Sequence, residues 1–277
     1  MIRKLTKLST RVSGKQCLLA MTLLAACSLT LAAERLTAGV DDEFRKQLFI
    51  ERASSQDLAS FSSDSGSFLG RLSLPADQTG FGLLMVVDQD RDLMQRNLET
   101  VLLNELGLSG WPVFIVSLGR TAQGSYQDES SQELYASILN SALREFEQRS
   151  IRQVVLLASE ASLETSSQLA ARSEVVSHLM HKINTRDKSG SAGLSVNSGI
   201  SQLNALSDSR VGIVDLVPAS MSKKMLASRK RALAKEQLAD LHDFIYVPGF
   251  EQTSSHQVIA KRLRAWMKEN RRGSDAT

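Results

Sequence analysis

The sequence predicts a single-domain α/β fold, in which helices cover both faces of a mostly parallel sheet. Three segments, at 82–87, 112–118 and 152–158, are near-continuous apolar runs, as is typical of strands buried on both faces of such a sheet. Amphipathic helical patterns at 91–106 and 134–146 separate these runs. Strands that alternate with helices imply right-handed crossovers between parallel strands.

The remaining elements follow in chain order. A serine-rich loop at 61–67 leads into an expected edge strand at 67–72. Two further strands are expected at 211–216 and 244–247, with a long charged helix over about 220–240 between them, and an amphipathic helix closes the chain. Residues 187–209 are rich in Ser, Gly and Asn, which predicts a long surface loop inside the domain.

The first 33 residues have the pattern of a secretory signal peptide. Residues 1–16 carry five basic and no acidic side chains, and an apolar run follows at 17–33. We expect export to a Gram-negative-type periplasm with cleavage after Ala33, and a retained membrane anchor is the alternative because the run is short for a span. The expected organisation is a signal peptide at 1–33, a polar, loosely helical lead-in at 34–66, the α/β domain at 67–270 and a disordered tail at 271–277.

Both cysteines lie inside this N-terminal segment. Residues 24–27, which end in Cys27, resemble a bacterial lipoprotein box, so Cys27 is a candidate lipidation site that would tether the chain to a membrane. Residues 28–33 stay apolar, whereas a lipidated chain usually continues with a polar tether, so cleavage and release are favoured. Because Cys17 and Cys27 both precede Ala33, the released chain would hold no disulfide.

The net charge of the whole chain, +3, comes from the signal segment. Removing five of the 33 basic side chains leaves 28 against 30 acidic ones, a net charge of −2. A near-neutral chain gives no general basic field for nucleic-acid binding. We expect a small molecule or an envelope component as the partner.

The turn after the strand at 152–158 is the most informative motif. In serine hydrolases with an α/β fold this turn reads Gly-x-Ser-x-Gly, and the serine is the nucleophile. Here it reads Ala158-Ser159-Glu160-Ala161-Ser162, so Glu160 takes the place of the nucleophile. Glu160 is a candidate catalytic carboxylate, but it is longer than the aspartate that such enzymes use. A solvated glutamate that the dipole of the next helix stabilises is the preferred interpretation.

Three further positions are candidates for a hydrolase site. Asp215 ends the strand at 211–216, where it could orient a histidine or cap the next helix. His256 precedes the final helix, as a base or as a solvated first-turn residue. Asp88 and Gln89 form the oxyanion-side loop, where the carboxylate would oppose a developing oxyanion although the backbone amides could donate.

Asp88, Glu160, Asp215 and His256 each follow a predicted strand directly or through a loop. Because the carboxyl ends of parallel strands meet at one edge of a sheet, we expect these four side chains to gather there. Three carboxylates beside one histidine would favour a cationic or hydroxyl-rich ligand.

Weaker patterns give no cofactor and no metal site. The acids at 88, 90 and 92 lack the glycine and the later glutamate of a calcium loop. His178 and His181 have helical i, i+3 spacing, but no third metal ligand accompanies them. A basic cluster at 223–235 is expected to be a solvated helix face, with contact to anionic lipid or an envelope polymer as the alternative.

From about residue 68 to 269 the layout resembles a bacterial α/β-hydrolase-like family, domain of unknown function 3530. The resemblance rests on the strand at 82–87, the entry Gly110-Trp111, the strand end at 214–216 and the basic, tryptophan-containing helix at 261–268. It implies a hydrolase fold and an envelope address, and Asp215 matches an aspartate of the family. We expect a protein that has lost standard serine-hydrolase catalysis and acts by binding, in envelope maintenance. The alternative is an esterase-like hydrolase that uses a non-standard constellation with Asp215 and His256.

Overall fold

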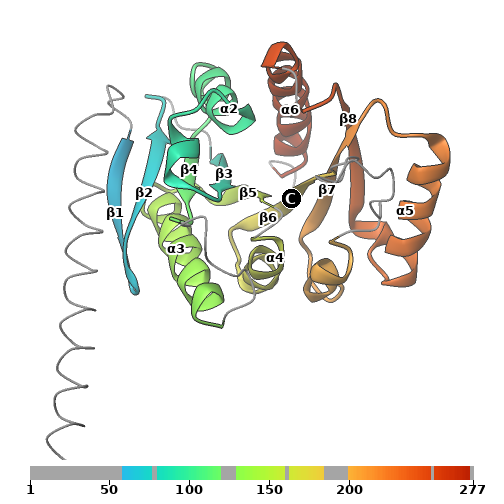
Figure 1. Ribbon diagram of the computed structural model, residues 1–277, viewed down its shortest axis with the longest axis horizontal. Helices are drawn as coiled ribbons and strands as arrows, with labels where there is room; N and C mark the ends of the chain where they lie inside the picture. The colour runs from blue at the N-terminus through green and yellow to red at the C-terminus, as the bar shows by residue number, and fades with distance from the viewer. Residues whose placement is uncertain are drawn as a thin grey trace, which may run out of the picture. The chain divides into compact units, whose positions relative to one another are not determined.

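The computed structural model describes residues 58–76, 80–119, 129–159, 162–183, 199–250 and 253–274, all within one compact unit. They form an eight-stranded sheet in the order β1-β2-β4-β3-β5-β6-β7-β8, which runs from β1 at the left to β8 at the right in Figure 1. Strands β1 (Leu58–Ser63) and β2 (Gly66–Ser73) are antiparallel to their neighbours. All pairs from β4 to β8 are parallel, which confirms the predicted fold class.

The other strands are β3 (Phe81–Val87), β4 (Val113–Ser117), β5 (Gln153–Ala158), β6 (Val176–Lys182), β7 (Gly212–Pro218) and β8 (His242–Val247). The α-helices are α2 (Leu98–Gly107), α3 (Glu129–Gln148), α4 (Leu163–Arg172), α5 (Lys223–Lys235) and α6 (Thr253–Ser274). Three 3-10 helices complete the described part of the chain: η1 (Asp90–Leu93), η2 (Ser201–Leu206) and η3 (Ala239–Leu241). All five strands that the sequence predicts from 82 onward are present.

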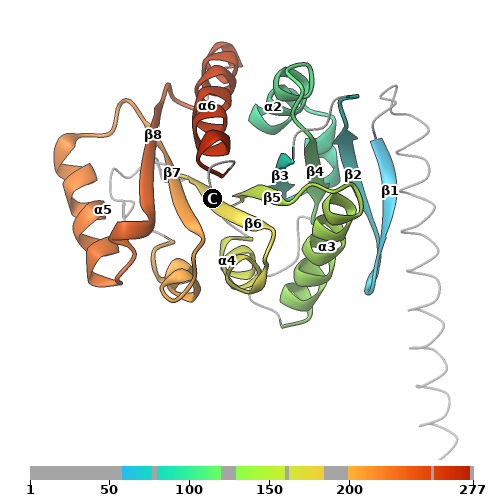
Figure 2. The same cartoon turned by 180° about the vertical axis from the view of Figure 1, so that it is seen from behind.

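Helices cover both faces of the sheet (Figures 1 and 2). Helices α2 and α6 pack together on one face, here called the α2/α6 face. Helices α3, α4 and α5 cover the other, here called the α3/α4/α5 face, where Leu156, Leu179 and Ile213 of the strands join Leu139 and Leu233 of the helices in one apolar cluster. Since side chains alternate along a strand, neighbouring residues of β6 and β7 belong to opposite faces.

Two expectations about strands are wrong. The expected edge strand is β2, which lies inside the sheet, because β1 pairs along its outer side from Leu58 onward. The histidine pair was expected on a helix, but His178 and His181 belong to strand β6. A spacing of three residues in a strand places these two side chains on opposite faces, so they cannot share a metal ion.

The predicted loop at 187–209 is only partly described. Its described part, from residue 199, contains η2, whose Leu203 and Leu206 are fully buried against the core and whose backbone packs on α4. The serine hydroxyl of Ser167 on α4 donates to the carbonyl of Gln202, which fixes this packing. This part of the segment is therefore structured rather than a surface loop.

Candidate functional site

Glu160 lies outside the described residues, but both ends of its turn are described. Strand β5 ends at Ala158 and α4 begins at Leu163. The buried hydroxyl of Ser159 donates to that of Ser162 at 3.0 Å, and the Ser162 hydroxyl accepts from the backbone N–H of Ser159 at 3.1 Å. Both hydroxyls are thus used to close the turn.

The loop on the expected oxyanion side turns at once into η1. The backbone N–H of Gln89 donates to the Asp92 carboxylate at 3.2 Å, so this amide is engaged by its own loop. Burial raises the pKa of Asp92 above its ordinary value, although the bond from Gln89 acts in the opposite direction. Asp88 is half-buried, and its Oδ1 is covered and has no hydrogen-bond partner.

Asp215 does not stand at the end of its strand. Strand β7 continues to Pro218, so Asp215 lies mid-strand, fully buried and on the same face as Ile213, the α3/α4/α5 face. It does not cap the following helix either. That N-cap is Ser222, whose hydroxyl accepts from the backbone N–H of Met225 at 3.3 Å.

Three basic side chains surround the Asp215 carboxylate. Arg229 of α5, itself fully buried, donates through Nε to Oδ2 at 2.5 Å and through Nη2 to Oδ1 at 2.9 Å. Nε2 of His242 lies 2.7 Å from Oδ2. Nδ1 of His181 lies 3.7 Å from Oδ1, beyond hydrogen-bond distance.

These contacts determine whether the Asp215 carboxyl is ionised. Burial opposes ionisation of Asp215, but the neighbouring His181, the hydrogen bonds from His242 and Arg229, and the charge of Arg229 outweigh it and hold its pKa well below its ordinary value. Asp215 is therefore an ionised partner of a buried arginine, and its two oxygens are already occupied.

His256 is also buried, in the first turns of α6. Its Nε2 lies 2.8 Å from the carbonyl oxygen of Phe250. Because a carbonyl can only accept, Nε2 is the donor of this hydrogen bond. Nδ1 is covered and has no hydrogen-bond partner.

The structure does not bring Asp215 and His256 together. Asp215 lies on the α3/α4/α5 face, whereas His256 is buried on α6, near Glu99 of α2. No hydrogen bond or ion pair joins these two described residues. The expected gathering of four side chains is wrong for this pair, because the sheet separates them.

A second charged cluster occupies the α2/α6 face. Glu99 lies in the first turn of α2, is 5% exposed, and forms an ion pair with Lys182 at the end of β6. Burial raises the pKa of Glu99, but the charge and hydrogen bond of Lys182 outweigh this, with a smaller contribution from nearby His256. Its pKa therefore lies below its ordinary value, so Glu99 is ionised.

A cavity of about 380 Å³ opens between Arg71 of β2, residues 94–96 after η1, helix α2 and the first turns of α6. Its lining includes Thr100 and Gln257, the immediate neighbours of Glu99 and His256 in the sequence. Its polar lining residues are Arg71, Gln95, Arg96, Thr100, Asn104, Glu105, Thr253 and Gln257. Charges of both signs and three carboxamides fit a polar ligand that offers hydrogen-bond donors and acceptors.

Sequence reasoning missed the partners of Asp215. Arg229 was assigned to a solvated basic face, yet Leu226, Arg229 and Leu233 have the i, i+3, i+7 spacing of one helix side, which would have placed Arg229 inward. His242 gave no signal, because its contact with Asp215 comes from pairing between β7 and β8.

Within the described ranges, no group of three or more His, Cys, Asp or Glu side chains is arranged to hold a metal ion. None of the helices in the described part of the chain is both long and apolar enough to cross a bilayer.

No family model matches the chain, and no curated protein matches its sequence. Solved structures do match. An α/β serine hydrolase homologue from Coxiella burnetii aligns with a TM-score of 0.51 at 12% identity, over 79% of this chain and 98% of that one. A dienelactone hydrolase from Anabaena variabilis gives 0.51 at 14% identity, over 77% and 99%.

A third match is carboxyl esterase 2 from the fungus Tuber melanosporum, with a TM-score of 0.52 at 14% identity over 78% of this chain and 88% of that one. Identities this low carry the fold and not the chemistry. They agree with the eight-stranded, mostly parallel sheet and its covering helices. The chain has an α/β-hydrolase fold.

Proposed function

We propose that this α/β-hydrolase-fold protein has lost serine-hydrolase catalysis and acts by binding a polar small molecule or envelope component, in envelope maintenance. The observation that carries the proposal is the state of His256. A general base must present a free ring nitrogen to the nucleophile. Here Nε2 is bonded to the Phe250 carbonyl, Nδ1 is covered, and Asp215 is committed to Arg229.

The positions of the nucleophile and of the oxyanion-binding loop also differ from those of a working serine hydrolase. Glu160 replaces the nucleophile in the sequence, and the hydroxyls of Ser159 and Ser162 bond to each other. The amide of Gln89, which could have donated to an oxyanion, donates to Asp92. The cavity lined by α2 and the first turns of α6 supports retained binding, since it offers polar groups without a nucleophile–base pair.

The test is a panel of short acyl esters with the parent, Glu160→Ala and His256→Ala. We expect no turnover above background in any of the three, and no labelling of the parent by a fluorophosphonate probe that reacts with activated serines. Turnover in the parent that disappears in either variant would overturn the proposal.

The alternative, an esterase-like hydrolase with a non-standard constellation, has one observation in its favour. Ionised Glu99 lies near His256, so an acid and a histidine are neighbours on the α2/α6 face, although the acid is not the expected Asp215. Such an enzyme would have to release Nε2 of His256 from Phe250. Loss of ester turnover in Glu99→Gln as well as in His256→Ala would support it.

We also propose a periplasmic address and kinship with the family of domain of unknown function 3530, both from the sequence patterns above. Intact mass of the protein purified from cells tests the address. A chain that starts near Glu34 supports release, and an acylated Cys27 at the start supports a lipid anchor. An intact N-terminus would contradict both.

A further inference from the structure

Helix α5 is held to the sheet along one side only. Its two buried side chains are Arg229 and Leu233, and Leu226 on the same side is half-buried. The paired bonds from Arg229 to Asp215 fix the rotation of the helix, because a buried guanidinium cannot leave its carboxylate without a large cost. The opposite side of α5 is therefore presented outward in a fixed orientation.

That outward side is strongly and uniformly cationic. Five exposed basic side chains span 13 residues, or about 18 Å of helix, and α5 contains no acidic residue. The small exposed residues Ala227 and Ala234 lie between them and add little bulk. We call this surface the α5 basic face, formed by Lys223, Lys224, Lys230, Arg231 and Lys235.

No acid among the described residues forms an ion pair with the α5 basic face. Lys230 lies over the ring of Phe244 at 5.1 Å, and Arg231 donates to the carbonyl of Ala227 in its own helix. The nearest acids along the chain, Glu236 and Asp240, follow the helix. The positive charge of this face is thus largely uncompensated.

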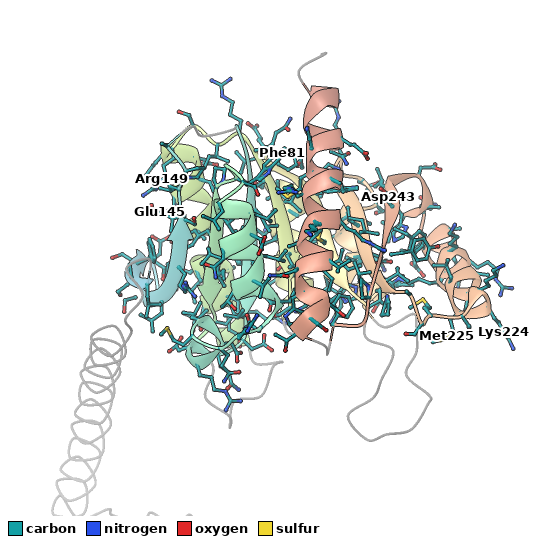
Figure 3. All side chains as sticks on the ribbon, turned by 90° about the horizontal axis from the view of Figure 1, so that it is seen from above. Phe81, Glu145, Arg149, Lys224, Met225 and Asp243 are labelled. Carbon is teal, nitrogen blue, oxygen red and sulfur yellow. The ribbon has the colours of Figure 1, made fainter. Side chains whose placement is uncertain are left out.

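Helix α6 also carries exposed basic side chains, and two of its arginines have partners inside the domain. Arg262 donates to the carbonyl of Tyr246, and Arg264 donates to the hydroxyl of Ser109 at 3.0 Å. These arginines tie α6 to β8 and to the end of α2. In Figure 1, α5 stands at the end of the molecule beyond β8, and Figure 3 labels Lys224 at its outer end.

We propose that the α5 basic face docks the protein onto the surface of an anionic lipid bilayer. Each Lys or Arg near such a surface strengthens association about fivefold, so five on one helix suffice for measurable binding. The face has no large apolar side chain to insert and no aromatic side chain on which bases could stack. Compact lysine charges among small residues fit a plane of lipid phosphates, and this docking is independent of the proposed ligand cavity.

The test is cosedimentation of the full chain, purified from cells, with vesicles of phosphatidylglycerol and phosphatidylcholine. Vesicles of phosphatidylcholine alone measure any contribution of the N-terminal segment. We expect tighter binding to the anionic vesicles, and a loss of about 25-fold in that preference in Lys224→Gln/Lys235→Gln. Raising the salt from about 0.01 M to about 1 M should abolish the preference, because the screening length falls from about 30 Å to about 3 Å.

The matched control removes two exposed cations from α6, in Lys261→Gln/Lys268→Gln, and should keep the anionic preference. Lys224→Arg/Lys235→Arg should also keep it, since the charge is retained. If the α5 and α6 variants lose the preference for anionic vesicles equally, the attraction comes from basic side chains spread over the protein and not from the α5 basic face. That result would overturn the proposal. So would a parent without anionic preference, or one that binds a soluble polyanion such as heparin but not the vesicles.

Discussion

Asp215 and Arg229 are both fully buried, and two opposite charges leave water at a tolerable cost only when they face each other with good hydrogen-bond geometry. Here the guanidinium meets both carboxylate oxygens, and His242 adds a third contact. At the level of single residues, the charge of Asp215 is therefore a structural one, used to attach α5 to β7.

We predict that Arg229→Met lowers the free energy of unfolding by about 3–5 kcal/mol, because it leaves a buried carboxylate without its main partner. The control is Lys235→Met on the exposed side of α5, which should change stability by about 0.5 kcal/mol or less. Urea unfolding measures both. Adding Asp215→Leu to Arg229→Met should recover part of the loss, and similar small effects in both single variants would contradict the structural role.

The second residue-scale prediction concerns pH. The pKa of Glu99 in the folded chain lies below its ordinary value of 4.5, so ionised Glu99 contributes stability that is complete above that value. The contribution is lost as the pH falls through the depressed pKa, because the Glu99 carboxyl of the unfolded chain is protonated at a higher pH than that of the folded chain. Urea unfolding between pH 6 and pH 3 should show a shallower decline in Glu99→Gln than in the parent. Parallel curves would contradict the ion pair with Lys182.

At the scale of elements, β6 shows why a strand can be mistaken for a helix. Val176, Leu179 and Met180 are buried and have the i, i+3, i+4 spacing of a helix face. A strand buried on both faces has no alternation to correct that impression. Strand β1 was not predicted for the opposite reason, because an edge strand rich in serine has the composition of a loop.

The packing of β6 against β7 and α6 gives the next prediction. His178 lies in T-shaped contact with Trp266, with ring centroids 4.9 Å apart, and a Cβ on Gly212 would come within 2.5 Å of its ring. Burial lowers the pKa of His178, which keeps the ring neutral between these neighbours.

Gly212→Ala should therefore destabilise the protein by about 1–3 kcal/mol, because the ring must move against Trp266. Gly80→Ala is the matched control, since a Cβ there meets nothing within 4 Å. Thermal unfolding compares the two. If Gly212→Ala is as stable as Gly80→Ala, the ring of His178 has room to move and the packing described here is wrong.

At the scale of the whole molecule, the sequence predicted the fold better than the site. Apolar runs report burial, and burial of alternating strands and helices is enough to predict a parallel sheet. The site depends on the face of the sheet from which each side chain projects, and a shift of one residue in the register of a strand moves a side chain to the other face. Asp215 lies on the same face of the sheet as Ile213, two residues before it, whereas the position of His256 is set by the packing of α6 on α2. The periodicity of the sequence shows neither of these placements.

This separation leads to the last prediction, that Glu160→Ser does not create a serine hydrolase. The variant restores a hydroxyl at the place of the nucleophile, but its base would be His256, whose Nε2 is bonded to Phe250. The acid, Asp215, lies across the sheet under Arg229. Since a positioned base contributes about 10²–10⁴-fold, ester turnover should stay within about tenfold of the parent.

A fluorophosphonate probe should likewise fail to label Glu160→Ser, because labelling needs an activated hydroxyl. The informative comparison is Glu160→Ser with and without His256→Ala. If the single variant turns over esters and the double variant does not, His256 must leave Phe250 and reach the turn after β5. A histidine that moves in this way would pair with Glu99 on its own face of the sheet rather than with Asp215, so Glu99→Gln should then abolish the acquired activity.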